Sequence, residues 1–346
     1  MRVSAIGDVI HTLPALFLLK HYFPHATIHW AVQQKAAPLL EHHPLLKHAW
    51  VFPDHYFSPY NLKTTIMMVK KLRTIKWDAI IDFQGLTKTS LLHLFLKGKK
   101  FGFSKEHTRE KICHWTTHYH DTPTYSNIVQ KNLSLASFAA QHLGAITKSP
   151  APENLVSTFF FTPPQEHIDT VSSWLEHHDI SRPILICPNT TWPSKHWPQA
   201  HWVECIRLIN EQTNLQPILV GATMGAAAAQ VAHECHQNTI PITICPPWNL
   251  LTLTHLVKQA HLLLCPDSGL LHLADYLGTP VIGIFGPTSK IKHGPFWTKG
   301  NNEQSIQVPC PHHYKKHHHP GAIDCMAALQ PQDIIQKIHN VINNDQ

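Results

Sequence analysis

The stretch CPDSGLLHLADYLGTPVIGIFGPT, residues 265–288, alternates apolar runs with polar turns in a pattern that indicates its fold class. An apolar run ends at Asp267, and the pair Asp267-Ser268 is typical of the start of a helix. The helical segment ends at Gly278, and a second apolar run follows before Gly-Pro-Thr. A strand, a helix and a strand in this order belong to a parallel sheet. We therefore expect a Rossmann-like α/β arrangement around this stretch.

The same alternation runs along the whole chain. Apolar runs such as WDAIIDF (77–83) in the first half and QPILVG (216–221) in the second are separated by longer segments of helical period. At 346 residues the chain exceeds the usual size of one hydrophobic core, so two domains are expected. The segment 148–166 is rich in proline at both ends and has no helical period. We predict two Rossmann-like domains, residues 1–150 and 166–346, joined by a linker at about 151–165.

The composition is that of a soluble globular protein. Hydrophobic residues make up 43% of the chain and charged residues 14%, and no stretch approaches the ~18 uninterrupted apolar residues of a membrane-spanning helix. Asp8, His11 and Pro14 interrupt the apolar run near the N-terminus, and no small-x-small cleavage site follows it. We therefore expect a protein that is retained in the cytoplasm.

The charge balance favours an acidic partner. There are 28 Lys and Arg against 22 Asp and Glu, a net charge of +6, and 31 His can add charge below neutral pH. A nucleotide, a phospholipid headgroup or a nucleic acid would fit this balance. Nucleic acid ranks last, because the basic residues form no long stripe and no recognised motif. The eight Cys contain no C-x-x-C pair, which indicates a reducing compartment.

A first candidate anion site lies at the turn 267–272. The Ser268 hydroxyl and the N–H groups of Gly269 and Leu270 could bind a pyrophosphate at the start of a helix, with His272 on the same side. In the alternative interpretation, Asp267 and Ser268 only cap the helix and His272 packs internally. Both interpretations fit the residues.

A second candidate is the loop NTTWPSKHWP, residues 189–198, which follows a predicted strand in the same half. The hydroxyls of Thr190 and Thr191 can bond to phosphate oxygens, and Lys195 can supply positive charge to a departing phosphate. The alternative is a surface loop with a solvated lysine.

The N-terminal half offers a carboxylate in SAIGDVIHTLPAL, residues 4–16. Asp8 follows a predicted strand, where it could act as a general base toward an acceptor hydroxyl. It could equally be the N-cap of the next helix. The spacing alone does not separate these two roles.

Five segments spread along the chain carry a further signal when they are taken together: GDVIHTLPAL, DFQGLTKTSLL, NTTWPSKHWP, the stretch 265–288 and CMAALQPQDIIQKI. Together they resemble the ADP-heptose:lipopolysaccharide heptosyltransferases of glycosyltransferase family 9, with the heptosyltransferase I branch most similar. The resemblance implies a GT-B fold, in which an acceptor-binding and a nucleotide-sugar-binding Rossmann-like domain face each other across a cleft. It also implies inverting transfer of heptose from ADP-heptose to Kdo of the lipid A inner core, at the cytoplasmic face of the inner membrane.

The resemblance also assigns roles to residues. Asp8 matches the catalytic base, and Lys195 matches the lysine that contacts the donor phosphate. In the basic stretch 97–111, Arg109 resembles an arginine that contacts the acidic inner core. No D-x-D motif occurs, so we expect metal-independent transfer with no cofactor. Donor-site positions are matched by Thr190, Thr191, Asp267, Ser268, Gly269 and His272, and the expected acceptor contacts are Arg109, Lys105 and Gln84.

The sequence departs from the family pattern at two places. Only Met-Arg-Val precedes Ser4, so we expect the first strand to be missing or much shortened, through truncation or a misassigned start. The segment 220–232 lacks the acidic residue that commonly contacts the donor ribose. Another nucleotide-sugar donor, or a non-catalytic nucleotide-binding homologue, therefore remains an alternative. Cys310 and Cys325 lack the tight paired spacing of a zinc site, so we expect no metal there.

Overall fold

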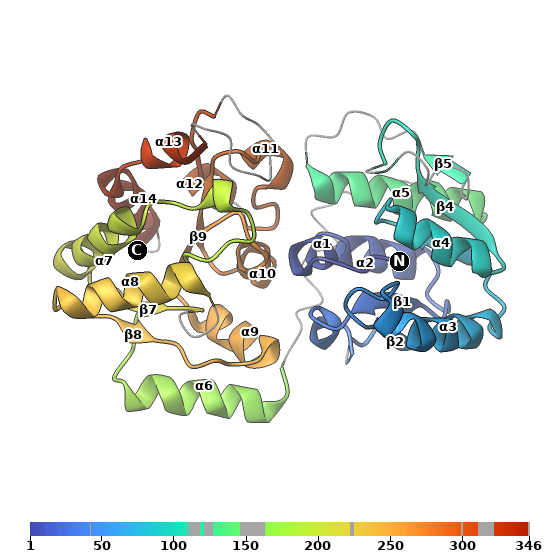
Figure 1. Ribbon diagram of the computed structural model, residues 1–346, viewed down its shortest axis with the longest axis horizontal. Helices are drawn as coiled ribbons and strands as arrows, with labels where there is room; N and C mark the ends of the chain where they lie inside the picture. The colour runs from blue at the N-terminus through green and yellow to red at the C-terminus, as the bar shows by residue number, and fades with distance from the viewer. Residues whose placement is uncertain are drawn as a thin grey trace. The chain divides into compact units, whose positions relative to one another are not determined.

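The computed structural model describes residues 1–41, 43–108, 110, 118–120, 127–145, 163–221, 225–298, 300–310 and 322–344. The chain divides into two compact units, Met1–Phe161 and Thr162–Gln346 (Figure 1). Each unit is an α/β arrangement of parallel strands and helices. The predicted linker at about 151–165 lies outside the described residues up to residue 162, and the helix α6 begins at Gln165.

The second unit is built on a six-stranded, wholly parallel sheet in the order β11-β10-β9-β6-β7-β8. Every residue of β6, β9 and β10 is buried, as expected of strands covered by helices on both faces. The strands are β6 (Pro183–Ile186), β7 (Gln216–Leu219), β8 (Thr243–Ile244), β9 (Leu262–Pro266), β10 (Val281–Phe285) and β11 (Ile306–Gln307).

The helices of this unit alternate with its strands. They are α6 (Gln165–His177), α7 (Gln199–Gln212), α8 (Ala226–Gln237), α9 (Leu250–Gln259), α10 (Gly269–Leu277), α11 (Lys290–His293), α12 (Asn301–Gln304), α13 (Ala322–Ala327) and α14 (Pro331–Asn344), with a short 3-10 turn η4 (Pro193–Lys195).

The strand-helix-strand interpretation of residues 265–288 is confirmed. β9 ends at Pro266, α10 starts at Gly269, and β10 begins at Val281. Gly278 ends α10 with a φ of 81°, the left-handed conformation that glycine adopts without strain. Ser268 occupies the N-cap position, but its side chain makes no capping hydrogen bond.

The strand order of the second unit reverses between β6 and β9. Numbered along the unit, the order is 3-2-1-4-5-6, so the chain runs outward in one direction from β6 and in the other from β9. In open α/β sheets, ligands bind beyond the carboxyl ends of the strands at this point of reversal. Two of the predicted site segments, 189–198 and 267–272, follow these two strands.

The first unit contains two small parallel sheets, β1-β2 and β3-β4-β5. The strands are β1 (His29–Gln33), β2 (His48–Phe52), β3 (Ala79–Asp82), β4 (Lys99–Phe103) and β5 (His118–His120). The helices are α1 (Ile6–Ile10), α2 (Leu13–Tyr22), α3 (Pro59–Arg73), α4 (Thr87–Phe95) and α5 (Ile128–His142), with a 3-10 turn η1 (Ala37–Leu39).

Residues 1–3 lie between these two sheets. The carbonyl of Val3 accepts a hydrogen bond from Gln33 N at 2.8 Å, and the carbonyl of Met1 accepts one from Phe83 N at 3.0 Å. The short segment therefore takes the place of a central strand, with β1 on one side and β3 on the other. The expected first strand is present only as this three-residue segment, and with it the first unit repeats the order 3-2-1-4-5-6.

Among the residues that the structure describes, none of the helices combines the length and the apolar character that crossing a lipid bilayer requires.

His93 on α4 gives a first testable prediction, because its fully buried ring has no hydrogen-bond partner among the described residues. Burial lowers the pKa of His93 to about 4. Between this value and the unfolded pKa near 6.5, the unfolded chain binds more protons, so acid destabilises the fold. We expect His93→Leu to reduce the loss of unfolding free energy between pH 7 and pH 5 by about 2 kcal/mol. Chemical denaturation at the two pH values measures this.

The exposed His25 provides the matched control, because His25→Leu should leave the pH dependence as it is in the wild type. An unchanged pH dependence in His93→Leu would show that the buried ring does not carry the effect.

Candidate functional site

The loops that follow β6 and β9 bring together three of the residues predicted from the sequence. Lys195 closes the 3-10 turn η4 after β6, Asp267 follows β9 directly, and His272 lies in the first turns of α10. All three side chains are buried. The strand order reverses between β6 and β9, so these residues stand where this class of sheet binds ligands.

Lys195 is held by an ion pair and an aromatic ring. Its Nζ lies 2.7 Å from Asp267 Oδ2 and 3.3 Å from the carbonyl oxygen of Asp267. The same ammonium lies 4.6 Å from the centre of the Trp192 ring, a cation–π distance. The interpretation of Lys195 as a solvated surface lysine is therefore wrong, since only 8% of the residue is exposed.

Asp267 links Lys195 to His272. Its Oδ1 lies 3.3 Å from His272 Nε2, while Oδ2 pairs with Lys195. Burial alone would raise the pKa of the Asp267 carboxyl, but the hydrogen bond from His272 and the charge of Lys195 outweigh it. The pKa of Asp267 is therefore held well below its usual range, and the carboxylate stays ionised. Asp267 thus holds Lys195 and His272 in place, and its predicted contact with the donor stays a prediction.

The other predicted donor-site residues lie in the same two segments of the chain but are not members of this cluster. Ser268 and Gly269 are half-buried at the start of α10, where backbone N–H groups and the helix dipole favour an anion. Thr190 is half-buried, and its hydroxyl has no hydrogen-bond partner among the described residues. Thr191 is exposed. The Thr190 hydroxyl oxygen is itself buried, and the donor-contact role of all four residues stays a prediction.

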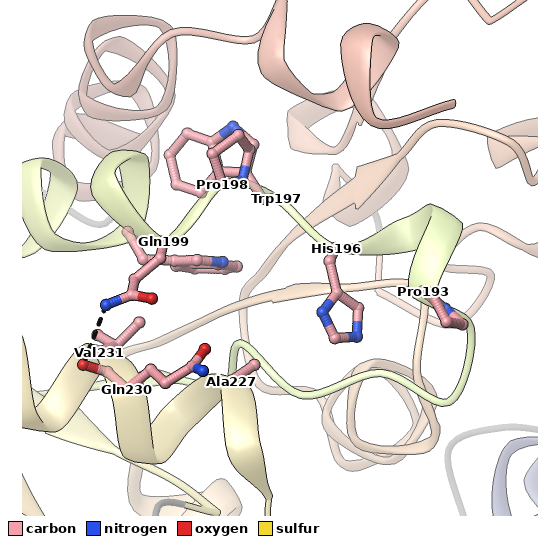
Figure 2. Close-up of a pocket in the computed structure, with 9 residues that line it drawn as sticks. Pro193, His196, Trp197, Pro198, Gln199, Ala227, Gln230 and Val231 are labelled. Atoms are coloured by element: carbon pink, nitrogen blue, oxygen red, sulfur yellow. Dashed lines mark hydrogen bonds between the residues drawn. The ribbon is translucent and has the colours of Figure 1, made fainter. Parts of the chain in front are cut away.

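A pocket of about 250 Å³ lies next to this loop, between the starts of α7 and α8 (Figure 2). Trp197 and Trp202 form part of its wall, and its polar groups include His196 and the side chain of Gln199, which donates to Gln230 O at 3.3 Å. Lys195 is not among its lining residues. No lysine or arginine is among the described residues that line this pocket.

Asn189 is a structural residue that sequence reasoning missed. Its Nδ2 donates to Gly221 O at 3.0 Å, and its Oδ1 accepts from Ala228 N at 3.1 Å. The side chain thus caps α8 and ties it to the loop that carries Lys195. A Cβ on Gly225 would lie 2.4 Å from the Asn189 amide, so only glycine leaves room for it. A Cβ at Gly221 would also meet the Asn189 amide, and the pair of glycines at 221 and 225 is the sequence feature that could have indicated this close approach.

This packing predicts a coupling between two substitutions. We expect Asn189→Ala to cost about 1 kcal/mol of unfolding free energy, because a cap and a second hydrogen bond are lost. In the wild-type background, Gly225→Ala should lower the unfolding free energy by more than this amount. In the Asn189→Ala background, where the clash is absent, the same substitution should lower it by almost nothing. Denaturation of the four proteins measures the cycle. Equal costs of Gly225→Ala in both backgrounds would contradict the contact.

In the first unit, Asp8 lies on α1 and pairs with a buried arginine. Asp8 Oδ1 is 2.5 Å from Arg2 Nη2, and Oδ2 accepts from Ala5 N at 3.3 Å. The N-cap of α1 is Ala5, so the interpretation of Asp8 as an N-cap is wrong. Asp8 instead occupies the third helical position and bonds back to the cap residue. Its side chain is 19% exposed, against 2% for Arg2, so the carboxylate keeps access to solvent.

Gln84 anchors the segment that leads to Asp8. The buried Gln84 follows β3, and its Oε1 accepts from Val3 N at 2.9 Å and from Ser4 N at 3.4 Å. These bonds occupy its carbonyl oxygen with the backbone, while its predicted contact with the acceptor stays a prediction. Lys105 is exposed after β4, and Arg109 lies outside the described residues.

Cys310 and Cys325 are both buried, and their sulfur atoms lie 2.8 Å apart. Within the described part of the chain, no group of three or more His, Cys, Asp or Glu side chains could hold a metal ion. The His-rich segment 311–321 between the two cysteines lies outside the described residues.

Comparison with known proteins gives consistent matches along the chain. The family model described as glycosyltransferase family 9 (heptosyltransferase) matches residues 66–322. Lipopolysaccharide core heptosyltransferase OpsX of Haemophilus influenzae is 26% identical over 305 residues, which cover 86% of this chain and 80% of that protein. Lipopolysaccharide heptosyltransferase 1 of Campylobacter coli is 23% identical over 350 residues, covering 100% of this chain and 98% of that protein.

Solved structures show the same fold. Escherichia coli heptosyltransferase WaaC with ADP superposes with a TM-score of 0.73 at 22% identity, covering 98% of each chain. A family 9 glycosyltransferase from Veillonella parvula superposes with a TM-score of 0.78 at 17% identity, covering 99% of this chain and 95% of that one. The predicted GT-B fold class is confirmed.

Proposed function

The chain belongs to glycosyltransferase family 9, and from this premise we propose that it transfers heptose from ADP-heptose to a Kdo residue of the lipid A inner core during lipopolysaccharide core synthesis. That it is a glycosyltransferase follows from the family. The donor, the acceptor and the inversion at the anomeric carbon are the proposed part. The relatives OpsX and heptosyltransferase 1 are named for heptosyl transfer in lipopolysaccharide synthesis, which supports this choice.

One observation carries the donor assignment, the Lys195–Asp267–His272 cluster at the reversal of strand order in the second unit. An ADP-sugar presents a diphosphate, and the cluster offers an oriented ammonium beside the start of α10. The WaaC structure with ADP shows that a protein of this fold takes this nucleotide. We place the diphosphate at Lys195 and the N–H groups of α10, with Thr190, Thr191, Ser268 and Gly269 as further contacts.

The proposed reaction needs a base and a stabilised leaving group. Asp8 takes the proton of the acceptor hydroxyl, whose oxygen forms a bond to the anomeric carbon of the sugar. The bond between that carbon and the diphosphate breaks, and Lys195 together with the helix start stabilises the charge on the departing ADP. Because these groups can neutralise the diphosphate, we propose that transfer needs no metal ion or cofactor.

A second candidate is a family member with a different sugar donor. The segment 220–232 carries no acidic residue, whereas the family resemblance implies one that contacts the donor ribose. Such an enzyme would use the same Asp8 and Lys195 but would fail with ADP-heptose.

The test is a transfer assay with the purified protein, Kdo-lipid A as acceptor and a panel of nucleotide-sugars that includes ADP-heptose, in the presence of EDTA. Mass spectrometry of the lipid product identifies the sugar that was added. A heptosylated product in EDTA supports the proposal in full. A product from another donor would establish the second candidate, and a product that disappears in EDTA would overturn the metal-independent mechanism.

A further inference from the structure

The large apolar side chains that reach solvent are concentrated on two helices of the first unit. Eight such side chains are exposed in the part of the chain that the structure describes, and all but Ile291 lie on α3 and α4. Only Thr65 and Leu72 of α3 are buried, so this helix lies on the surface of its unit. The exposed group, called the α3/α4 patch below, consists of Tyr60, Leu62, Ile66, Met67, Leu91, Leu94 and Phe95.

The two helices belong to the same side of the unit. Leu72 of α3 and Leu92 of α4 share one hydrophobic cluster, against which Met68 and Val69 of α3 also pack. The helices appear next to each other at the outer edge of the unit in Figure 1. The exposed apolar side chains of the two helices therefore belong to one region of the unit's surface.

The charges on these helices have a single sign. α3 carries Lys63, Lys70, Lys71 and Arg73, α4 carries Lys88, and neither helix contains Asp or Glu. More cations follow each helix, at Lys76 and in the segment 97–100. Lys63, Lys70 and Lys71 are exposed and form no ion pair with another described residue. The apolar surface is thus bordered by unpaired positive charge.

We propose that the α3/α4 patch is the surface through which the protein binds an anionic phospholipid bilayer. Apolar side chains on such helices enter the boundary between headgroups and acyl chains, while the lysines contact the phosphates. A second copy of the chain is a poorer occupant, because a symmetric contact would place these cations against one another. This inference goes beyond the proposed reaction and does not depend on its donor or acceptor.

The test measures binding of the full chain to vesicles that contain no acceptor lipid. We compare vesicles of phosphatidylcholine alone with vesicles that also contain phosphatidylglycerol, by co-sedimentation. The wild type should bind the anionic vesicles and release them at high salt. The double substitution Met67→Glu and Leu94→Glu should weaken this binding at least about tenfold. The substitution Ile291→Glu changes the one large apolar side chain outside the patch that is exposed among the described residues, and it should leave binding unchanged.

A second variant separates the electrostatic contribution to vesicle binding from the apolar one, and it guards against an effect of misfolding. Lys70→Glu with Lys71→Glu alters only exposed charges, and it should weaken binding to anionic vesicles about tenfold at low salt. Circular dichroism and thermal unfolding confirm that each variant is folded. Undiminished vesicle binding in both double variants would overturn the proposal. The proposal would also be overturned if the wild type did not bind anionic vesicles but self-associated through the patch.

Discussion

Replacing Lys195 by methionine is expected to lower kcat/KM for sugar transfer about 10³-fold, the effect of removing one preorganised donor of positive charge. Asp267, at 2.7 Å, and the Trp192 ring hold the ammonium in place. No further free energy is therefore needed to orient it during the reaction. Methionine keeps the apolar stem and removes the charge. Steady-state kinetics with a saturating acceptor measures the change.

The substitution also leaves the Asp267 carboxylate buried without its main partner, which costs about 3 kcal/mol of stability. A double variant, Lys195→Met with Asp267→Asn, separates the two effects. It should recover much of the stability, because no unpaired charge remains, and it should stay as inactive as the single variant. The exposed Lys258 gives a control in the same unit, where Lys258→Met should retain full activity. Recovery of activity in the double variant would show that Lys195 serves only to neutralise Asp267.

Asp8→Asn is expected to reduce kcat about 10³-fold, because asparagine cannot accept the proton of the acceptor hydroxyl. Binding of ADP, which we assign to the second unit, should be unchanged in isothermal titration. The loss should therefore fall on kcat rather than on donor affinity. Asp54 offers a control carboxylate in the same unit, since it also pairs with a cation but lies at the surface, and Asp54→Asn should keep wild-type turnover.

Two outcomes of the Asp8 experiment would change the assignment. Wild-type turnover in Asp8→Asn would place the general base elsewhere. Absence of turnover in the wild type with every nucleotide-sugar of the panel, with ADP binding retained, would indicate a non-catalytic nucleotide-binding homologue. Because Asp8 also neutralises the buried Arg2, thermal unfolding of the variant must be recorded, and the assay run below its transition.

Local sequence patterns predicted the elements around the site well. The stretch 265–288 showed its strand, helix and strand because an apolar run, a capping pair and a terminal glycine follow each other directly in the chain. The same pattern placed Lys195 and Asp267 each after a predicted strand of the same half. It did not show that Asp267 holds Lys195, because that ion pair joins residues 72 positions apart.

Two further contacts that local patterns missed are also of this long-range kind. Gln84 bonds to Val3 from 81 positions away, and Asn189 reaches Ala228 across 39 positions. Propensity and periodicity describe a residue's own neighbourhood, whereas these side chains act on backbone groups of distant segments. The same limit applies to the apolar face of α3, which looks in sequence like any helix that packs in a core.

The three-residue segment between β1 and β3 has a consequence for how the first unit is made. The segment Met1–Val3 is synthesised before its hydrogen-bond partners, since Gln33 follows its partner Val3 by 30 positions and Phe83 follows its partner Met1 by 82. Pairings of such wide separation form slowly, since a long loop must close before the contact is gained. Until Phe83 has been synthesised, the edge of segment 1–3 that faces β3 stays uncovered, and such edges invite pairing with other chains. Closing the two sheets around this segment is therefore expected to be a late step of folding, and the step at which a nascent chain is most open to chaperones and to aggregation.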